Sequence, residues 1–109
     1  MTKYIIDYFN DSVQETILSL PEVFKPRYLR YTDKMEEYGS NLGMPHTYPM
    51  GDGLYELRIR GQDGIARVFF CTTVGRKIVM LHCFIKKTQK TPKKELDIAI
   101  KRMKEVKNG

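Results

Sequence analysis

The strongest constraint on the fold of this chain is the alternation of apolar and polar residues between positions 54 and 86. LYELRIR (54–60) alternates strictly, and IARVFFCT (65–72) and KIVMLHCFIK (77–86) are rich in the β-branched and aromatic residues that favour strands. The links GQDG (61–64) and VGRK (74–77) are short and contain turn residues. Three consecutive strands with tight links predict an antiparallel meander.

A strand and two helices are expected before this meander. KYIIDYF (3–9) is typical of a strand, after which Asn10 or Asp11 can cap a short helix that ends near Leu20. A second helix is expected from about Pro26 to Tyr38, with Gly39 as its stop. The first half of the glycine-rich segment 39–64 is interpreted as a loop.

One helix is expected after the meander. Thr91 can cap it, with Pro92 at its first position, and one face then collects apolar residues: Leu96, Ala99, Ile100, Met103 and Val106. The fold class is therefore α+β: an N-terminal strand and two helices, a three-stranded antiparallel meander and a C-terminal helix. A length of 109 residues predicts a single domain over 1–109.

The positive charge of the chain is concentrated at its end. The net charge is +6, and residues 1–85 hold ten basic and ten acidic side chains. Residues 86–109 hold nine basic side chains against three acidic ones, and therefore carry the whole excess. Such asymmetry indicates an anionic partner, most often nucleic acid or an acidic protein segment. A solvated helix that is simply rich in lysine is an equal alternative on charge alone.

The alternation places several cations on one face of the meander. Arg58, Arg60, Arg67 and Lys86 share that face with His82, and Phe69 and Phe84 could stack on bases there. The acids on the face are Glu56 and Asp63, too few to balance the cations. A single arginine would be explained by solvent exposure, but the group favours a nucleic-acid surface. The grouping depends on the register, because a slip of one residue would break it.

The segment FIKKTQKTP (84–92) adds a second indication of an anion site. Lys93 and Lys94 lie in the first turn of the last helix, where the helix dipole disfavours cations. An anion held between the strand end and the helix start would explain them, since helix N-terminal amides also bind anions. Tolerated repulsion at an exposed helix end is the alternative.

Several other classes of protein are not indicated. No apolar stretch reaches the roughly 20 residues that span a bilayer, and the first 20 residues lack the pattern of a signal peptide, so the chain is expected in the cytoplasm. Cys71 and Cys83 are expected to be buried thiols, and they and His82 lack the spacing of a zinc site. His46 in the loop Gly-Met-Pro-His could act as a base, but a lone loop histidine is more often solvated.

Three stretches of the chain are similar to a known family. LYELR (54–58), GIARVFF (64–70) and HCFIKKTQKTP (82–92) resemble the RelE/ParE superfamily of bacterial toxins, specifically the HigB-like, phage-derived branch of type II toxin–antitoxin systems. The resemblance covers about half of the chain. It implies a RelE-like fold and an endoribonuclease, an mRNA interferase that cuts messenger RNA on the ribosome and inhibits translation and growth. It also implies a co-expressed helix-turn-helix (HigA-like) antitoxin in a hetero-oligomer.

The resemblance also implies roles for individual residues. In this family the RNA's own 2′-hydroxyl attacks the adjacent phosphate, and neither a metal nor another cofactor is needed. Arg67 and Arg58 would stabilise the phosphate, Lys86 and Lys87 would flank it, and His82 or a lysine would move protons. The remaining RNA contacts would come from stacking or basic side chains: Tyr55, Arg60, Phe84, Lys90, Lys93 and Lys94.

Two other functions stay open at the level of the sequence. Some relatives carry a tyrosine or histidine near the chain end for proton transfer, whereas neither residue type follows His82 here. A ParE-like inhibitor of DNA gyrase would share the fold without cutting RNA. A catalytically inactive module that binds RNA or an antitoxin is the third reading.

Overall fold

The structure, a computed structural model, describes residues 3–62, 64–88 and 90–108, and has the predicted α+β class. Over these residues the elements follow in the order β1 (Ile5–Tyr8), α1 (Asp11–Leu18), α2 (Lys25–Tyr38), β2 (Thr47–Gly51), β3 (Leu54–Gly61), β4 (Gly64–Thr73), β5 (Lys77–Lys86) and α3 (Lys93–Asn108). Asp63, one of the two acids expected on the basic face, lies outside the described residues.

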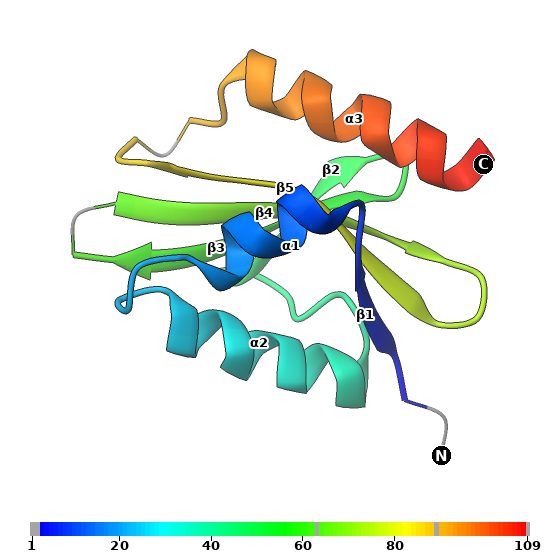
Figure 1. Cartoon of the computed structure of the whole chain (residues 1–109), viewed down its shortest axis with the longest axis horizontal. Helices are drawn as coiled ribbons and strands as arrows, with labels where there is room; N and C mark the ends of the chain where they lie inside the picture. The colour runs from blue at the N-terminus through cyan, green and yellow to red at the C-terminus, as the bar shows by residue number, and fades with distance from the viewer. Residues whose placement is uncertain (1–2, 63, 89, 109) are drawn as a thin grey trace.

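The predicted meander forms the centre of a mixed sheet. In the described part of the chain this sheet has five strands in the order β1-β5-β4-β3-β2. β3, β4 and β5 pair antiparallel as predicted, and β2 adds an antiparallel edge, whereas β1 pairs parallel with β5. Helix α3 lies on one side of the sheet, and α1 and α2 lie on the other (Figure 1).

The N-terminal helices lie close to the predicted positions, although α1 ends at Leu18, before the predicted end near Leu20, and α2 begins at Lys25. The side chain of Asn10 accepts a 2.8 Å hydrogen bond from the backbone N–H of Val13, which caps α1. Gly39 ends α2 with φ 109°, a conformation that glycine adopts without steric cost. The predicted cap of α3 is wrong, because the carbonyl of Pro92 accepts the first helical bond from Leu96, and the Thr91 hydroxyl is hydrogen-bonded elsewhere.

Strand β2 lies in the segment that the sequence interpretation assigned to a loop. Pro49 argues against a strand in the sequence, because proline lacks the backbone N–H that a central strand needs for its hydrogen bonds. β2 is an edge strand that pairs only with β3, so the missing donor costs no ladder bond on its open side. The turn into β3 passes through Asp52, with φ 54°, between two glycines with positive φ.

Apolar side chains cover both faces of the sheet. Beneath α1 and α2 the core includes Leu57, Val68 and Phe70, and beneath α3 it includes Phe69, Leu81 and Met103. The predicted apolar stripe of α3 is confirmed, with Ala99 and Met103 buried. The face on which the sequence places the cations is therefore not wholly exposed. Helix α3 covers part of that face, and the end with Arg60 and Lys86 remains exposed.

A β-bulge in β5 changes which side chains share a face. Phe69 lies opposite His82, and Phe70 opposite Met80, so that Leu81 is the extra residue. The sequence predicts that Met80 shares a face with His82, but Met80 is buried on the α1 and α2 side with Cys83. The carbonyl of Leu81 accepts a 2.8 Å hydrogen bond from Arg102 of α3, which satisfies the bulged backbone.

None of the helices in the described residues combines the length and the apolar character that crossing a membrane requires.

Candidate nucleic-acid interface

The strand register brings most of the predicted site residues into one small grid. On the α3 side of β3, β4 and β5 three rows run across the sheet, each with one residue per strand: Arg60, Ile65 and Lys86; Arg58, Arg67 and Phe84; Glu56, Phe69 and His82. The grouping expected from the alternation is therefore confirmed. Tyr55 lies on the opposite face, where it stacks on Phe70 at 5.6 Å between ring centroids, and the predicted lysines at 87, 90, 93 and 94 follow the strands and lie outside the grid.

At the centre of this grid Arg67 is fully buried. Its Nη1 lies 3.8 Å from Oε2 of Glu56, and neither side chain is exposed. Burial lowers the pKa of the Arg67 guanidinium, and the carboxylate of Glu56 opposes that shift. Arginine stays charged despite such a shift, so the pair is a buried ion pair that needs further hydrogen bonds. The predicted direct contact between Arg67 and a substrate phosphate does not fit this geometry.

The basic segment after β5 supplies those hydrogen bonds. Arg67 donates from Nη2 to the carbonyl of Thr88 and from Nη1 to the Thr91 hydroxyl, the second at 3.1 Å. Thr91 donates in turn to Oε2 of Glu56 at 2.9 Å. We call residues 87–88 and 90–92 the basic loop. Its Thr88 and Thr91 contact Arg67, and its Lys87 and Lys90 are exposed to solvent, as is Lys86 at the end of β5.

Arg58 and Arg60 are held at the exposed side of the grid. Nε of Arg58 donates a 2.6 Å hydrogen bond to Oε1 of Glu56, and its guanidinium carbon lies 3.9 Å from the centre of the Tyr48 ring. Arg60 donates from Nη2 to the Tyr48 hydroxyl at 3.2 Å. Two guanidinium groups are thus fixed by one carboxylate and one ring from neighbouring strands, which orients them for a planar anion.

His82 lies apart from the exposed cations. Its Nε2 is 2.9 Å from Oε1 of Glu95 in α3, and its ring centroid lies 6.4 and 5.9 Å from those of Phe69 and Phe84, which also contact each other. Four strand residues separate it from Lys86, a distance of about 13 Å along β5. The structure therefore does not bring His82 together with the Arg60–Lys86 row, which weakens its expected role in proton transfer.

The positive charges in the first turn of α3 are better balanced by nearby carboxylates than the sequence suggests. Nζ of Lys93 lies 3.2 Å from Oδ2 of Asp97, one turn further along, and both side chains are exposed. Glu95 supplies a negative charge in the same turn. This pairing accounts for Lys93 without a bound anion. Lys94 is exposed on the same turn.

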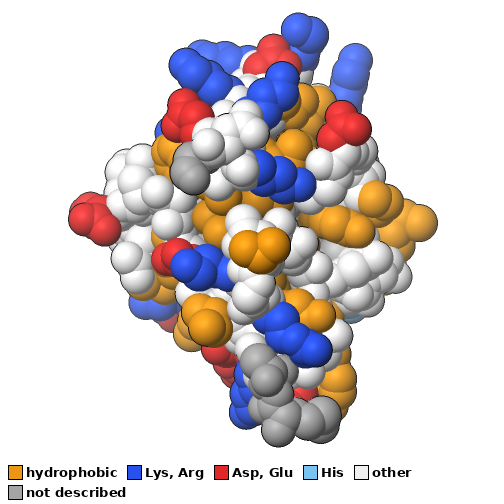
Figure 2. Space-filling view, turned by 90° about the vertical axis from the view of Figure 1, so that its right-hand side faces the viewer, with side chains coloured by type: hydrophobic (Ala, Val, Ile, Leu, Met, Phe, Trp, Pro, Cys, Tyr) orange, Lys and Arg blue, Asp and Glu red, His pale blue; other side chains and the backbone are white. Residues whose placement is uncertain are grey.

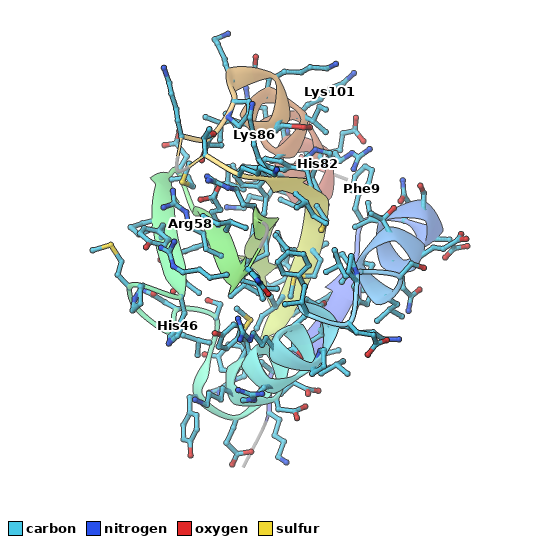
Figure 3. The ribbon with its side chains drawn as sticks, turned by 90° about the vertical axis from the view of Figure 1, so that its left-hand side faces the viewer. Phe9, His46, Arg58, His82, Lys86 and Lys101 are labelled. Carbon is cyan, nitrogen blue, oxygen red and sulfur yellow. The ribbon has the colours of Figure 1, made fainter. Side chains whose placement is uncertain are left out.

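Arg60 and Lys86 form the part of the grid that can hold a phosphate. They flank Ile65 in one row, and two steps between strands separate their Cα atoms by about 10 Å. Side chains of this length can reach a single phosphate between them. Figure 3 shows Arg58 on the side of the molecule away from α1, with Lys86 and then His82 further towards α1.

Sequence reasoning missed the contributions of Tyr48 and Thr91. Tyr48 belongs to the unrecognised strand β2, and Thr91 was assigned to a helix cap. The pattern Tyr-Pro at 48–49 between glycine-rich segments gave no strand signal, because proline argues against one. Among residues 3–62, 64–88 and 90–108 no cluster of three or more His, Cys, Asp or Glu side chains could hold a metal ion.

Comparisons with known proteins agree with this fold. The family model described as Phage derived protein Gp49-like matches residues 15–104. A mutant of the Escherichia coli toxin RelE in the free state superposes with a TM-score of 0.65 at 11% identity, over 93% of this chain and 98% of RelE. The RelE–RelB complex from the archaeon Pyrococcus horikoshii OT3 gives 0.51 at 22% identity, over 78% and 96%. No curated protein matches the sequence. The predicted RelE-like, phage-derived resemblance is thereby confirmed.

Proposed function

Because the chain belongs to the Phage derived protein Gp49-like family and has the fold of RelE, we propose that it is the toxin of a toxin–antitoxin pair that cleaves messenger RNA on the ribosome. The observation that carries this proposal is the row of Arg60 and Lys86 beside the oriented guanidinium of Arg58. Two of these cations are half-exposed or exposed on β3 and the third is exposed on β5, so an RNA phosphate bound across this end of the sheet would lie between positive charges from both strands.

The proposed reaction uses the RNA's own 2′-hydroxyl. Its oxygen attacks the adjacent phosphorus while its proton passes to solvent water and the bond from phosphorus to the 5′-oxygen breaks. The products are a cyclic phosphate and, once the 5′-oxygen has taken up a proton, a free 5′-hydroxyl. Arg58, Arg60 and Lys86 stabilise the negative charge that develops on the phosphate oxygens. Lys87 follows Lys86 directly in the sequence and is exposed at the start of the basic loop. It donates the proton that the leaving 5′-oxygen takes up.

In this proposal Arg67 is a positioning residue. Its guanidinium ties the basic loop to the sheet through Thr88 and Thr91, and it reaches Arg58 through Glu56. A buried ion pair of this kind fixes geometry more than it adds stability. The position of Lys87 and Lys90 beside the Arg60–Lys86 row therefore depends on Arg67, although Arg67 itself touches no substrate.

The proposed partner is an antitoxin of the HigA-like, helix-turn-helix kind that forms a hetero-oligomer with this chain in the cytoplasm. The similarity to the RelE of a RelE–RelB complex supports an antitoxin partner in general. Such an antitoxin would neutralise the toxin either by covering its exposed cations or by preventing the toxin from fitting on the ribosome. Co-purification of the product of a neighbouring gene with this chain is the expected result.

The proposal is tested with translating ribosomes and a defined messenger RNA. The wild-type protein should produce discrete new 5′ ends inside the translated frame, each carrying a hydroxyl. A single 2′-deoxynucleotide placed at the 5′ side of a mapped cut should abolish that cut, because the attacking oxygen is then missing. The same message without ribosomes should stay intact.

Matched variants connect the activity to the site. Lys86→Gln combined with Lys87→Gln should reduce cleavage by about 100-fold or more, since charge stabilisation and proton transfer each contribute about that much. Lys101→Gln combined with Lys104→Gln removes the same charge from exposed positions of α3 and should cleave normally. Cuts that survive the 2′-deoxy substitution would contradict the reaction. DNA breaks linked to gyrase without RNA cuts would instead support the ParE-like function.

A further inference from the structure

A second group of cations lies between α2 and the edge of β3, away from the basic loop. It lines a cavity of about 290 Å³ whose walls are Arg27, Arg30, Tyr31, Pro45, His46, Arg58 and Arg60. We call this cavity the arginine pocket. Four guanidinium groups meet in it, and its lining contains no carboxylate. The basic C-terminal segment contributes none of its residues.

The arginine pocket fills a gap at the sheet edge. β2 pairs with β3 only as far as Leu57, so the outer half of β3 has no neighbouring strand on that side. The backbone N–H of Arg58 donates to the carbonyl of His46 at 2.9 Å, and Nη1 of Arg27 donates to the carbonyl of Arg60. The free edge is thus closed by residues of the pocket, and the pocket is anchored to the sheet.

The walls of the arginine pocket are held in place before any ligand arrives. The ring of His46 packs on that of Tyr31 at 4.8 Å, while Glu56 and Tyr48 fix Arg58 from the other side. The charge is nevertheless unbalanced, because Glu56 also serves Arg67. Within residues 3–62, 64–88 and 90–108 the structure records no ion pair for Arg27, Arg30 or Arg60. An excess of guanidinium groups in a concave site is suited to an anion.

We propose that the arginine pocket binds one nucleotide of single-stranded RNA, through its phosphate and the attached nucleoside. The cavity is at the lower limit of pockets that hold small ligands, about 300–1,000 Å³, and therefore suits a single nucleotide. Guanidinium forks match the geometry of phosphate oxygens, and the Tyr31 and His46 rings offer flat surfaces to a base. An acidic peptide would satisfy the charges but would make no use of the rings.

The position of the pocket defines its relation to the proposed cleavage site. Arg58 and Arg60 line the pocket and also belong to the grid, so a strand that leaves the Arg60–Lys86 row can continue into the pocket without a break. Arg58 and His46 lie along the same edge of the molecule (Figure 3). By contrast, the end shown in Figure 2 carries Lys and Arg side chains among acidic and hydrophobic ones. The choice of RNA as ligand rests on the proposed function.

Binding is tested on the purified protein without ribosomes. Uridine monophosphate, uridine and inorganic phosphate are titrated separately, and backbone amide shifts of α2 and residues 43–48 are followed by NMR. The monophosphate should shift these amides and bind at least about tenfold more tightly than either uridine or phosphate alone, because charge and stacking both contribute. Equal affinity for phosphate and the monophosphate would show an anion site without a nucleoside, and would overturn the proposal.

Variants separate the pocket from general charge. Two variants remove charge from the pocket: Arg30→Gln alone, and Arg27→Gln combined with Arg30→Gln. Each should weaken the binding of an eight-nucleotide single-stranded RNA by about tenfold or more. Each should also reduce the slope of log affinity against log salt concentration by about 1. Lys101→Gln with Lys104→Gln, which keeps the pocket, should change affinity less than twofold by the same reasoning. Arg30 makes no hydrogen bond within the described residues, so its variant tests the pocket even if the double variant unfolds. Unchanged RNA affinity in a folded Arg30→Gln protein would overturn the proposal.

Two further results distinguish this proposal from others. If polyglutamate of matched charge displaces the RNA and binds more tightly, the pocket is a site for an acidic protein segment and the proposal fails. If the wild-type protein binds nucleotides in the pocket but cuts no message on ribosomes, the proposed function fails while the pocket stands. If the wild-type protein cuts the message on ribosomes but binds no nucleotide, the pocket proposal fails while the proposed function stands.

Discussion

Thr91 donates a hydrogen bond of 2.9 Å to the buried carboxylate of Glu56, across 35 positions of the sequence. This bond joins the start of the last helix to the middle of the sheet. Thr91 also accepts from Arg67, so one hydroxyl connects both members of a buried ion pair. The exposed Lys87 and Lys90 belong to the same loop as Thr91, so this connection fixes the backbone that carries them.

Thr91→Val should loosen the basic loop. Valine keeps the shape of the side chain but leaves Arg67 and Glu56 each one partner short, which should cost about 1–3 kcal/mol of the free energy of unfolding. Cleavage on ribosomes should fall as well. Thr88→Val is the matched control, because Thr88 contributes its carbonyl to Arg67 and its side chain is exposed. Equal effects of the two variants in urea denaturation would contradict the role of the Thr91 hydroxyl.

Glu56→Gln should be among the most destabilising single changes in the chain. It removes the carboxylate that Arg58 and Arg67 share and leaves the buried guanidinium without a counter-ion, at a cost of about 3–5 kcal/mol. Asp97→Asn, which breaks the exposed pair with Lys93, should cost less than about 0.5 kcal/mol. Thermal unfolding of both variants measures the contrast. A Glu56→Gln protein as stable as the wild type would show that Arg67 is satisfied without a carboxylate.

The association with ribosomes should depend steeply on salt. Contacts between cations and RNA phosphates release counter-ions, so affinity should fall as ionic strength rises. Removing Lys87 by Lys87→Gln should reduce the slope of log affinity against log salt concentration by about 1, as expected for one lost phosphate contact. The Lys101→Gln variant should keep the wild-type slope. An association that is insensitive to salt would exclude the exposed cations as the contact surface.

Gly61→Ala should destabilise the turn between β3 and β4. A Cβ atom at this position would lie 2.7 Å from Cε1 and 3.1 Å from Cζ of the Phe24 ring, and that ring is buried. Displacement of the ring should cost about 1–3 kcal/mol, the usual range for overpacking. Gln62→Ala, at the exposed next position, is the control and should be nearly neutral. Equal melting temperatures for the two variants would show that the ring can move freely.

The two cysteines should be inert in the folded protein. Burial raises the pKa of the Cys83 thiol to about 12, and it also raises that of Cys71. Neither thiol should react with an aromatic disulfide at pH 8 until the protein is unfolded. Because the folded pKa of Cys83 exceeds the unfolded value of about 8.5, its contribution to stability is complete below pH 8.5 and is lost as the pH rises towards 12. Fast labelling of the native protein at pH 8 would contradict this burial.

Much of the fold could be predicted because local signals and tertiary structure agree. The meander has strict alternation, and Asn10 and Gly39 mark helix ends whose caps the structure confirms. Strand β2 could not be predicted, since Pro49 is excluded from central strands and only the sheet order reveals that this strand lies at an edge. The bulge at Leu81 likewise depends on pairing between strands, which a single strand sequence does not encode.

The site was predictable in its members more than in their roles. Alternation identified Arg58, Arg67 and Lys86 as neighbours on one face, and the register bears this out. The burial of Arg67 could not be predicted from strand alternation, because it results from contacts with a loop that follows β5. Arg27 and Arg30 were also missed, although their spacing of three residues places them on one side of α2.

The pairing of β1 with β5 determines how much of the chain must be synthesised before the sheet can be completed. β1 is made first, yet the partner that it needs is the last strand of the sheet, with Ile5 beside Lys77. A nascent chain must therefore hold its first strand unpaired until most of the sequence has left the ribosome, and closing so long a loop is a slow step. Thr91 emerges later still. Any product of interrupted translation that ends before β5 would lack both the complete sheet and Lys86 of the proposed cleavage site, so such prematurely terminated copies should be harmless to the cell that makes them.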